Sequence, residues 1–173
     1  MSDAVFPDRN EEEFIDMALK LGYDEIIFIS GNPSYTYESG RIRIKKAFFA
    51  GKQDKKPKSF DYLFAPAERK FFESTPDFII NAELSDRKDS VHYRRSALNQ
   101  VHAKLCREND IALVFSFGNL LAGKRAITLG RMMQNAMLAR KYKLKTAAFS
   151  LARDPWQMRS RTVLDALMKV LGL

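Results

Sequence analysis

Two spacings of apolar residues divide the first thirty positions into three elements. Residues 3–6 and 24–30 are short runs rich in apolar and β-branched side chains, which predicts two strands. Four apolar side chains recur between these runs at helical spacing: Phe14, Ile15, Ala18 and Leu21. Asn10 stands three residues before Glu13, as in an N-cap with a returning carboxylate, and Gly22 can end the helix. A strand, a helix and a strand within about 30 residues predict a parallel βαβ unit.

Strand and helix patterns continue to alternate to the end of the chain. Further strands are predicted at residues 41–50, 61–64, 77–81, 111–117 and 145–150, and an open loop at 51–59. Further helices are predicted from Pro66 to about Ser74, from a cap at Ser96 to about Arg107, over residues 127–142, and near the C-terminus. This order predicts one domain over residues 1–173, of the α/β class with a mainly parallel sheet. The pattern leaves open whether the sheet is open or closed into a barrel.

Two of the predicted helices carry apolar stripes. In the helix at residues 127–142 the stripe consists of Leu129, Met132, Met133, Ala136 and Met137. Four polar residues fall mostly off this stripe: Arg131, Gln134, Asn135 and Lys141. We therefore expect the methionines to pack in the core rather than to form a partner groove. The stripe of the terminal helix consists of Val163, Leu164, Leu167, Val170 and Leu171.

Composition excludes several classes of protein. A hydrophobic fraction of 46% and a charged fraction of 29% are ordinary for a globular domain and exclude global disorder. No apolar run approaches the roughly 20 residues that a membrane-spanning helix needs. A single cysteine, Cys106, excludes an intrachain disulfide and a cysteine zinc site, and fits a cytoplasmic location. The N-terminus has neither a basic lead nor an apolar stretch, so we expect no signal peptide.

The charge of the chain is positive and unevenly distributed. The formal net charge is +8, yet residues 1–30 hold eight acidic and two basic residues. The basic excess lies in residues 41–60, 87–107 and 124–161. Acids at one end and three later basic blocks favour a surface that faces a polyanion. A merely basic protein, or an assembly module whose basic blocks meet an acidic protein, stays open.

Signatures of an enzyme are weak. The chain has two histidines: His102 falls on the apolar side of its predicted helix, which favours packing, and His92 lies among arginines that disfavour a bound cation. Residues 118–125 resemble a phosphate loop but lack its spacing and its hydroxyl, although Lys124 and Arg125 could hold a phosphate before a helix. A rival hypothesis is a metal-dependent phosphoesterase that uses Asp61, Asp77, Glu83 and His92. The three carboxylates are predicted at or near strand ends, where barrels place catalytic residues.

Basic and aromatic residues occur together in two segments. Residues 87–95 contain four bases with His92 and Tyr93, and arginines surround Trp156 in a segment that has the pattern of a loop. Arginine can bind a phosphate with two hydrogen bonds, and an aromatic ring can stack on an unpaired base. No helix-turn-helix or zinc-finger spacing is present. These blocks therefore predict binding to structured RNA rather than sequence-specific binding to DNA.

Four short motifs in consecutive order resemble the ribonuclease P protein component 3 family, the archaeal relatives of the eukaryotic thirty-kilodalton subunit. They are His-Tyr-Arg-Arg-Ser-Ala-Leu-Asn-Gln at 92–100, Ile-Ala-Leu-Val-Phe-Ser-Phe at 111–117, Arg-Met-Met-Gln-Asn-Ala at 131–136, and Ser-Leu-Ala-Arg-Asp-Pro-Trp-Gln-Met-Arg-Ser-Arg at 150–161. A closing Leu-Gly-Leu follows at 171–173. The resemblance covers the second half of the chain and the strand–helix opening.

The resemblance implies a (β/α) TIM-barrel-like fold, similar to the polymerase-and-histidinol-phosphatase barrels. It also implies a protein subunit of the endoribonuclease that removes the 5′ leader of precursor tRNA. In that family the RNA does the chemistry, so we expect no catalytic residue and no cofactor or metal bound by the protein, with magnesium serving the RNA. The implied partners are the RNase P RNA, protein component 2 and other subunits, and indirectly precursor tRNA, with no membrane.

Eight basic residues are the candidates for contact with RNA phosphates: Arg94, Arg95, Lys104, Lys124, Arg125, Arg131, Arg159 and Arg161. Arg159 falls in the family's Gln-Met-Arg-Ser position, and Ser96 and Asn99 are expected to cap and orient rather than to touch RNA. Two positions depart from the family pattern, Ala97 where glycine is common and Gln100 where histidine is frequent. Family chains usually run longer, so we expect a barrel that is shortened by an element or closed by a partner.

Overall fold

Seven parallel strands form the centre of the molecule, in a computed structural model that describes residues 2–51, 56–84, 89–91 and 94–173. Their order in the sheet equals their order in the sequence, so each neighbouring pair is joined by a crossover. The strands are β1 (Ser2–Val5), β2 (Glu25–Ser30), β3 (Arg43–Phe49), β4 (Tyr62–Pro66), β5 (Phe78–Ile80), β6 (Ala112–Ser116) and β7 (Thr146–Phe149). Every predicted strand is present with its bounds shifted by a few residues. The predicted loop after β3 falls partly on residues 52–55, outside the described ones.

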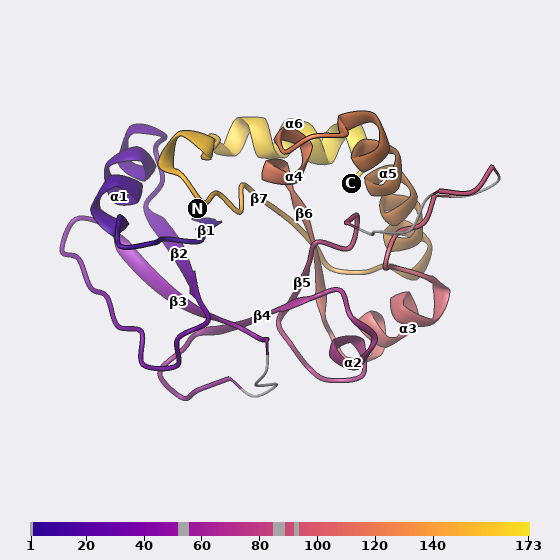
Figure 1. Cartoon of the computed structure of the whole chain (residues 1–173), viewed down its shortest axis with the longest axis horizontal. Helices are drawn as coiled ribbons and strands as arrows, with labels where there is room; N and C mark the ends of the chain where they lie inside the picture. The colour runs from indigo at the N-terminus through magenta and orange to yellow at the C-terminus, as the bar shows by residue number, and fades with distance from the viewer. Residues whose placement is uncertain (1, 52–55, 85–88, 92–93) are drawn as a thin grey trace.

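The two edges of the sheet meet and nearly close it into a barrel (Figure 1). Residues 150–152, which follow β7, run parallel to β1, and Val5 forms a bridge with Ala152. The amide of Leu151 donates to the carbonyl of Ala4 at 3.0 Å, and that of Phe6 to the carbonyl of Ala152 at 2.8 Å. The predicted barrel is confirmed, and the described chain joins its own edges without a partner.

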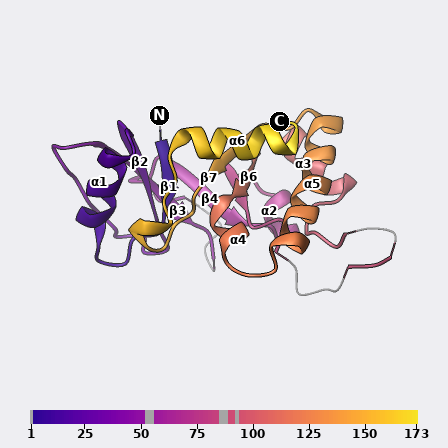
Figure 2. The same ribbon diagram turned by 90° about the horizontal axis from the view of Figure 1, so that it is seen from above.

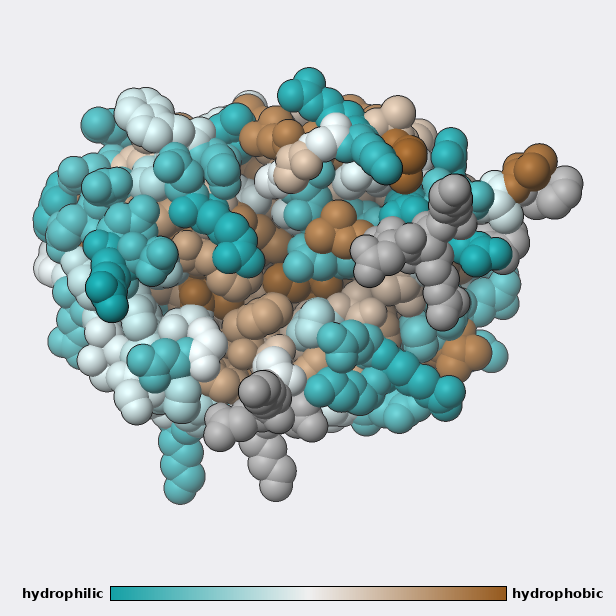
Figure 3. All heavy atoms as spheres, viewed as in Figure 1, coloured by the Kyte–Doolittle hydropathy of each residue, from teal (hydrophilic) through white to brown (hydrophobic). Residues whose placement is uncertain are grey.

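Apolar side chains fill the barrel and also cover its outside. Alternate residues of each strand point inward, and the interior cluster consists of Ala4, Ile27, Ile29, Ala47, Phe64, Ile80, Val114, Phe149 and Leu151. Residues of the other parity pack outward against the helices. In the view of Figure 3 the face over the strands is hollowed near its centre, with hydrophobic residues at the bottom and hydrophilic ones around it.

The helices surround the barrel in two groups (Figures 1 and 2). Helix α1 (Glu11–Lys20) covers β1 and β2, while α2 (Arg69–Phe72), α3 (Gln100–Glu108) and α5 (Arg125–Tyr142) cover the opposite side. Helix α6 (Arg161–Leu171) packs on β7 and α5. Two short elements were not predicted, α4 (Phe117–Leu121) and the 3-10 helix η1 (Pro155–Gln157). None of the helices in the described part of the chain is long and apolar enough to cross a membrane.

Two predicted helix starts are wrong in detail, and the third helix starts after Asn10 as predicted but without the cap hydrogen bond. Pro66 ends β4, and α2 begins only at Arg69. Asn99 rather than Ser96 caps α3, because the Asn99 side chain accepts the amide of His102 at 2.9 Å. The Asn10 side chain makes no cap hydrogen bond with α1 and accepts the amide of Asp8 instead.

The buried face of α5 differs from the predicted stripe. Met132 and Ala136 are fully buried, but Met133 is 49% and Met137 64% exposed. Consecutive helical residues point about 100° apart, and in α5 this step turns Met133 away from the barrel while Met132 faces it. Arg131 and Asn135, expected off the stripe, are buried. The core prediction is therefore confirmed for Met132 and wrong for Met133 and Met137. In α6, Leu164, Leu167 and Leu171 are buried, whereas Val163 and Val170 are exposed.

Candidate nucleic-acid interface

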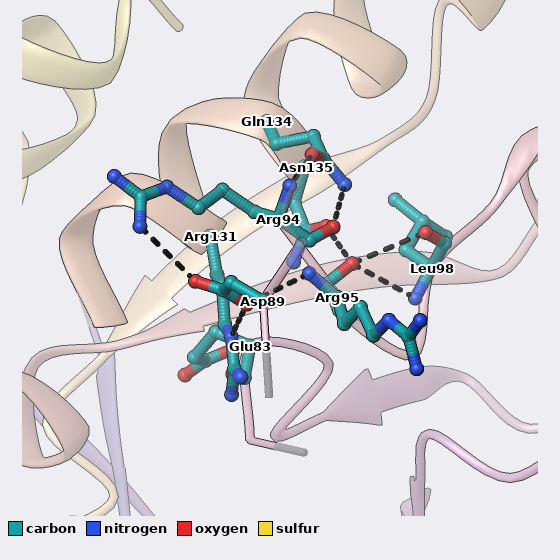
Figure 4. A network of polar contacts seen from close by, with 9 residues as sticks. Glu83, Asp89, Arg94, Arg95, Leu98, Arg131, Gln134 and Asn135 are labelled. Atoms are coloured by element: carbon teal, nitrogen blue, oxygen red, sulfur yellow. Dashed lines mark hydrogen bonds and ion pairs between the residues drawn. The ribbon is translucent and has the colours of Figure 1, made fainter. Parts of the chain in front are cut away.

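The Asp89 carboxylate organises the basic segment that precedes α3 (Figure 4). It accepts the Arg95 amide at 2.8 Å, the Arg131 Nε–H at 2.9 Å and an Arg94 Nη1–H at 3.1 Å. The hydrogen bond from the Arg95 amide is the largest cause that lowers the pKa of Asp89 below its usual range, and the guanidinium groups of Arg131 and Arg94 lower it further. One carboxylate thus fixes three of the predicted RNA-contacting arginines relative to one another. This arrangement was not predicted from the sequence, because Asp89 lies 42 residues from Arg131.

Two polar residues of α5 dock the same segment onto the helix. Gln134 accepts the Arg94 amide at 3.0 Å through Oε1 and donates Nε2–H to the Arg94 carbonyl at 2.8 Å. The Ser96 hydroxyl donates to Asn135 Oδ1 at 2.6 Å. The Arg94 side chain lies across Gly130, where an added Cβ would come within 3.1 Å of its Nε. The backbone of this segment is fixed, while the side chains of Arg94 and Arg95 remain exposed.

Arg131 lies beneath this surface. Only 7% of the residue is exposed, and besides Asp89 its guanidinium donates to the Glu83 carbonyl at 3.3 Å. A buried arginine paired in this way supports the segment from below. Its burial makes Arg131 a poor candidate for direct contact with phosphate. Its position next to Arg94 and Arg95 was not predicted from the sequence.

The remaining candidates are spread over the same half of the molecule. Lys104 lies on the exposed face of α3, and Lys124 and Arg125 are exposed at the start of α5. Arg161 begins α6 and forms an ion pair with Asp165 at 2.7 Å. The Arg94 side chain lies against Gly130 of α5. Arg125 is in the same helix, about one and a half turns before Gly130.

Arg159 holds the turn between η1 and α6. Its Nη1 donates to the carbonyls of Met158 at 2.6 Å and Trp156 at 2.9 Å, and its guanidinium lies 5.5 Å from the centre of the Phe117 ring. The Tyr23 hydroxyl donates to the Arg159 carbonyl at 2.7 Å. This side chain is half-buried, so it contributes to the fold whether or not it also contacts RNA, which stays a prediction.

A buried carboxyl group lies at the carboxyl ends of β5 and β6. Glu83 is 1% exposed, and its Oε1 accepts a hydrogen bond from Asn119 Nδ2 at 2.6 Å. Asn119 also donates to Asn81, whose φ of 61° lies in the left-handed region that asparagine tolerates. Burial raises the pKa of Glu83 from the ordinary 4.5 to about 7, and its Oε2 has no hydrogen-bond partner among the described residues. The sequence identified Glu83 as a strand-end carboxylate but not its burial.

The other carboxylates of the phosphoesterase hypothesis lie elsewhere. Asp61 and Asp77 precede β4 and β5, at the amino ends of the strands, whereas Glu83 follows β5. Asp61 accepts hydrogen bonds from Lys45 Nζ and the Lys46 amide, and Asp77 accepts the Leu63 amide. The expectation that all three occupy the catalytic edge of the barrel is wrong, because two of them lie at its opposite end.

Histidine and cysteine supply no metal site in the described part of the chain. It contains no group of three or more His, Cys, Asp or Glu side chains placed to hold a metal ion. His102 stacks on Phe72 with ring centres 4.2 Å apart and contacts the Ala97 carbonyl through Nδ1, as expected of a packed histidine. Burial raises the pKa of the Cys106 thiol to about 12, which keeps it unreactive. His92 lies outside the described residues.

Three of the acids in the first thirty residues form ion pairs with basic residues of the same chain. Arg41 forms ion pairs with Asp16 at 2.6 Å and Glu12 at 3.3 Å, and Glu12 also accepts the Tyr37 hydroxyl. Arg43 pairs with Glu25 at 3.4 Å. Part of the first basic block therefore faces the acidic amino-terminal segment. The basic excess that remains lies on α3, α5 and α6, in the segment before α3 and in the residues that flank η1.

Comparison with known proteins found similar structures but no match to the sequence. The sequence matches no protein-family model and no curated protein. The structure is similar to a chain of the cryo-EM structure of archaeal ribonuclease P with mature tRNA, with a TM-score of 0.73 and 15% identity, over 97% of this chain and 82% of that chain. It is also similar to histidinol phosphate phosphatase from Lactococcus lactis, in complex with zinc, L-histidinol and phosphate, with a TM-score of 0.62 and 11% identity, over 99% and 94% of the two chains.

A third similar structure is an uncharacterized protein, with a TM-score of 0.52 and 8% identity, over 99% of this chain and 68% of that one. At these identities the likeness is one of fold. The predicted TIM-barrel-like class is confirmed.

Proposed function

We propose that this chain is a protein subunit of ribonuclease P, the ribonucleoprotein that removes the 5′ leader of precursor tRNA. The observation that carries the proposal is the fold match over 97% of the chain to a chain of archaeal ribonuclease P with mature tRNA. The four ordered motifs of the second half support the same assignment independently of the structure.

The chemistry of the described residues supports a role in binding rather than in catalysis. A surface on which exposed basic residues outnumber the acids that pair with them suits the phosphates of a folded RNA. In the proposed complex the RNA cleaves the substrate with magnesium. This protein then acts with component 2 to hold the RNA in its active structure, and meets precursor tRNA only through the complex.

A metal-dependent phosphoesterase is the second candidate, favoured by the fold match to histidinol phosphate phosphatase. It is the weaker one, because Asp61 and Asp77 lie at the opposite end of the barrel from Glu83. Among the described residues no cluster of metal ligands replaces them.

Reconstitution tests the proposal. Adding the chain with component 2 to the catalytic RNA is expected to lower the magnesium concentration needed to cleave precursor tRNA. The chain alone, assayed with magnesium, manganese or zinc, is expected to cleave nothing. Cleavage by the chain alone that Asp77→Ala abolishes would instead establish the phosphoesterase.

A further inference from the structure

Trp156 is the sole tryptophan of the chain, and it is 79% exposed. A tryptophan side chain is usually well buried, because its large ring gains more than any other from leaving water. Here the indole extends from η1, where the chain passes from β7 to α6. The fold gains little from this ring.

The backbone that carries Trp156 is held firmly although its side chain is not. Asp154 Oδ1 accepts the Trp156 amide at 2.9 Å, and the Gln157 amide donates to the Asp154 carbonyl at 2.9 Å. The buried Pro155 occupies the first turn, and Arg159 Nη1 binds the Trp156 carbonyl at 2.9 Å. An exposed aromatic ring on a fixed turn is prepared for a partner, since little conformational entropy is lost when it binds.

The charges around the turn favour a nucleic acid as that partner. Arg153 is exposed, with its guanidinium 4.8 Å from the centre of the Phe6 ring, and its amide donates to Gln157 Oε1 at 3.1 Å. The one acid of the turn, Asp154, is used as a cap. Helix α1 packs against η1 and carries four acids, Glu11, Glu12, Glu13 and Asp16. Glu12 and Asp16 pair with Arg41, and Glu11 accepts the Tyr35 hydroxyl. An aromatic ring beside a cation is the arrangement with which proteins bind single-stranded nucleic acids.

We propose that Trp156 and Arg153 form a binding site for one unpaired nucleotide of RNA, whose base stacks on the indole while Arg153 neutralises a neighbouring phosphate. This inference rests on the proposed RNA-binding function and adds to it a contact with single-stranded RNA. The site is distinct from the segment around Asp89, which offers cations and, in its described residues, no aromatic platform.

The single tryptophan makes the contact directly observable by fluorescence. Titration of the full chain with a ten-nucleotide oligoadenylate is expected to quench the indole emission, with the same midpoint as binding measured by anisotropy of a labelled oligonucleotide. Inorganic polyphosphate, which carries charge without bases, is expected to bind without quenching. Trp156→Ala is expected to weaken oligonucleotide binding about 5- to 150-fold, the range measured for a lost base stack.

Variants separate stacking from folding and from charge. Trp156→Phe retains most of the affinity because a ring remains, and Trp156→Ala leaves the melting temperature unchanged. Arg153→Ala weakens binding but leaves the quenching at saturation. Val170→Ala, which removes a 65% exposed apolar residue of α6, is the matched control and changes neither.

The outcomes are distinguishable from those of the proposed function. Unquenched emission with intact RNA binding, or a Trp156→Ala variant that loses only association with component 2, overturns the nucleotide site and leaves the ribonuclease P assignment standing. Quenching by oligoadenylate together with failed reconstitution supports the nucleotide site and overturns the ribonuclease P assignment.

Discussion

At the scale of single residues, two carboxyl groups near the carboxyl end of β5 have opposite electrostatic environments. Asp89 accepts hydrogen bonds from three donors, two of them cationic, so that its ionised form is favoured. Glu83 is deeply buried with one amide donor, so that its neutral form is favoured. Their side-chain chemistry is nearly the same, and the difference arises from the groups that face them.

The burial of Glu83 predicts a pH-dependent stability. Its pKa of about 7 in the folded chain exceeds the ordinary 4.5, so the folded chain holds this proton more tightly than the unfolded chain. The stabilisation is complete below about pH 4.5 and is lost as the pH rises through 7, by about 3 kcal/mol in total.

Urea unfolding between pH 4.5 and 8 measures this dependence. Asp3, whose pKa burial raises to about 6, contributes with the same sign, so Glu83→Gln is expected to remove roughly half of the decline. Asp3→Asn is expected to remove the remainder. An unchanged pH profile in Glu83→Gln would show that the group does not titrate in this range.

The exposed arginines predict a salt-dependent loss of RNA affinity. Arg94→Ala and Arg95→Ala are each expected to weaken binding to the catalytic RNA whatever its base sequence. The slope of log affinity against log salt should shrink by roughly 0.7 to 1 per lost phosphate contact. Lysine at these positions restores part of the affinity, since the charge remains and the planar fork is lost.

Arg159→Ala separates the two roles of that side chain when melting curves are measured beside the titrations. A role confined to the turn predicts lower stability with an unchanged slope. Arg69→Ala is the control, since Arg69 is an exposed arginine of α2 that pairs with Glu73. Unchanged slopes for Arg94, Arg95 and Arg159 would refute the RNA contacts.

At the scale of elements, α5 connects the barrel with the candidate interface. Its apolar side packs on the barrel through Met132, Ala136 and Ala139. Its neighbouring polar side, with Arg131, Gln134 and Asn135, holds the segment that carries Arg94 and Arg95. One helix therefore has two buried sides of different chemistry, and its third side exposes Met133 and Met137.

Adjacent methionines of α5 provide a matched test of this orientation. Met132→Ala is expected to destabilise the chain by about 2–5 kcal/mol, because it leaves a cavity in the core. Met133→Ala is expected to change stability by less than about 0.5 kcal/mol, as at most exposed positions. Chemical unfolding of both variants decides the matter, and equal losses would mean that the helix is rotated from the orientation described.

At the scale of the whole molecule, the fold separates charge and closes the barrel at one seam. Three acids of the first thirty residues pair with Arg41 and Arg43, and most of the positive excess lies on the opposite half. The seam between β1 and residues 150–152 depends on Asp3, a fully buried carboxylate. Its Oδ1 accepts the amides of Ser150 at 2.7 Å and Ala4 at 2.9 Å.

Closure of the barrel predicts that the seam loosens when this acceptor is removed. Asp3→Ala leaves two buried amides without a partner, at a cost of about 1–3 kcal/mol each. Hydrogen exchange at Ser150, Leu151 and Phe6 is expected to become faster, while exchange within β4 changes little. Asp3→Asn retains the oxygen and is expected to retain the protection. Exchange that is unaffected in Asp3→Ala would contradict the role given to this carboxylate.

The sequence by itself determined the alternation of strands and helices, the core of each strand and the unequal distribution of charge. These properties follow from local periodicity and composition, which act over a few residues and can be detected without knowing what packs against what. The ordered motifs also predicted the barrel class and the resemblance to a ribonuclease P protein. Which side of α5 faces the barrel was not predictable, because Met132 and Met133 have the same chemistry and differ only in the direction of their side chains.

Only the tertiary structure decided which distant residues meet. Asp89 with Arg131, Glu12 with Arg41, and β1 with the segment after β7 are pairs far apart in the sequence. Their contacts depend on the crossovers between strands, and so does the burial that raises the pKa of Glu83. Long-range contacts of this kind leave no periodic pattern, since each requires the rest of the barrel to bring its partners together.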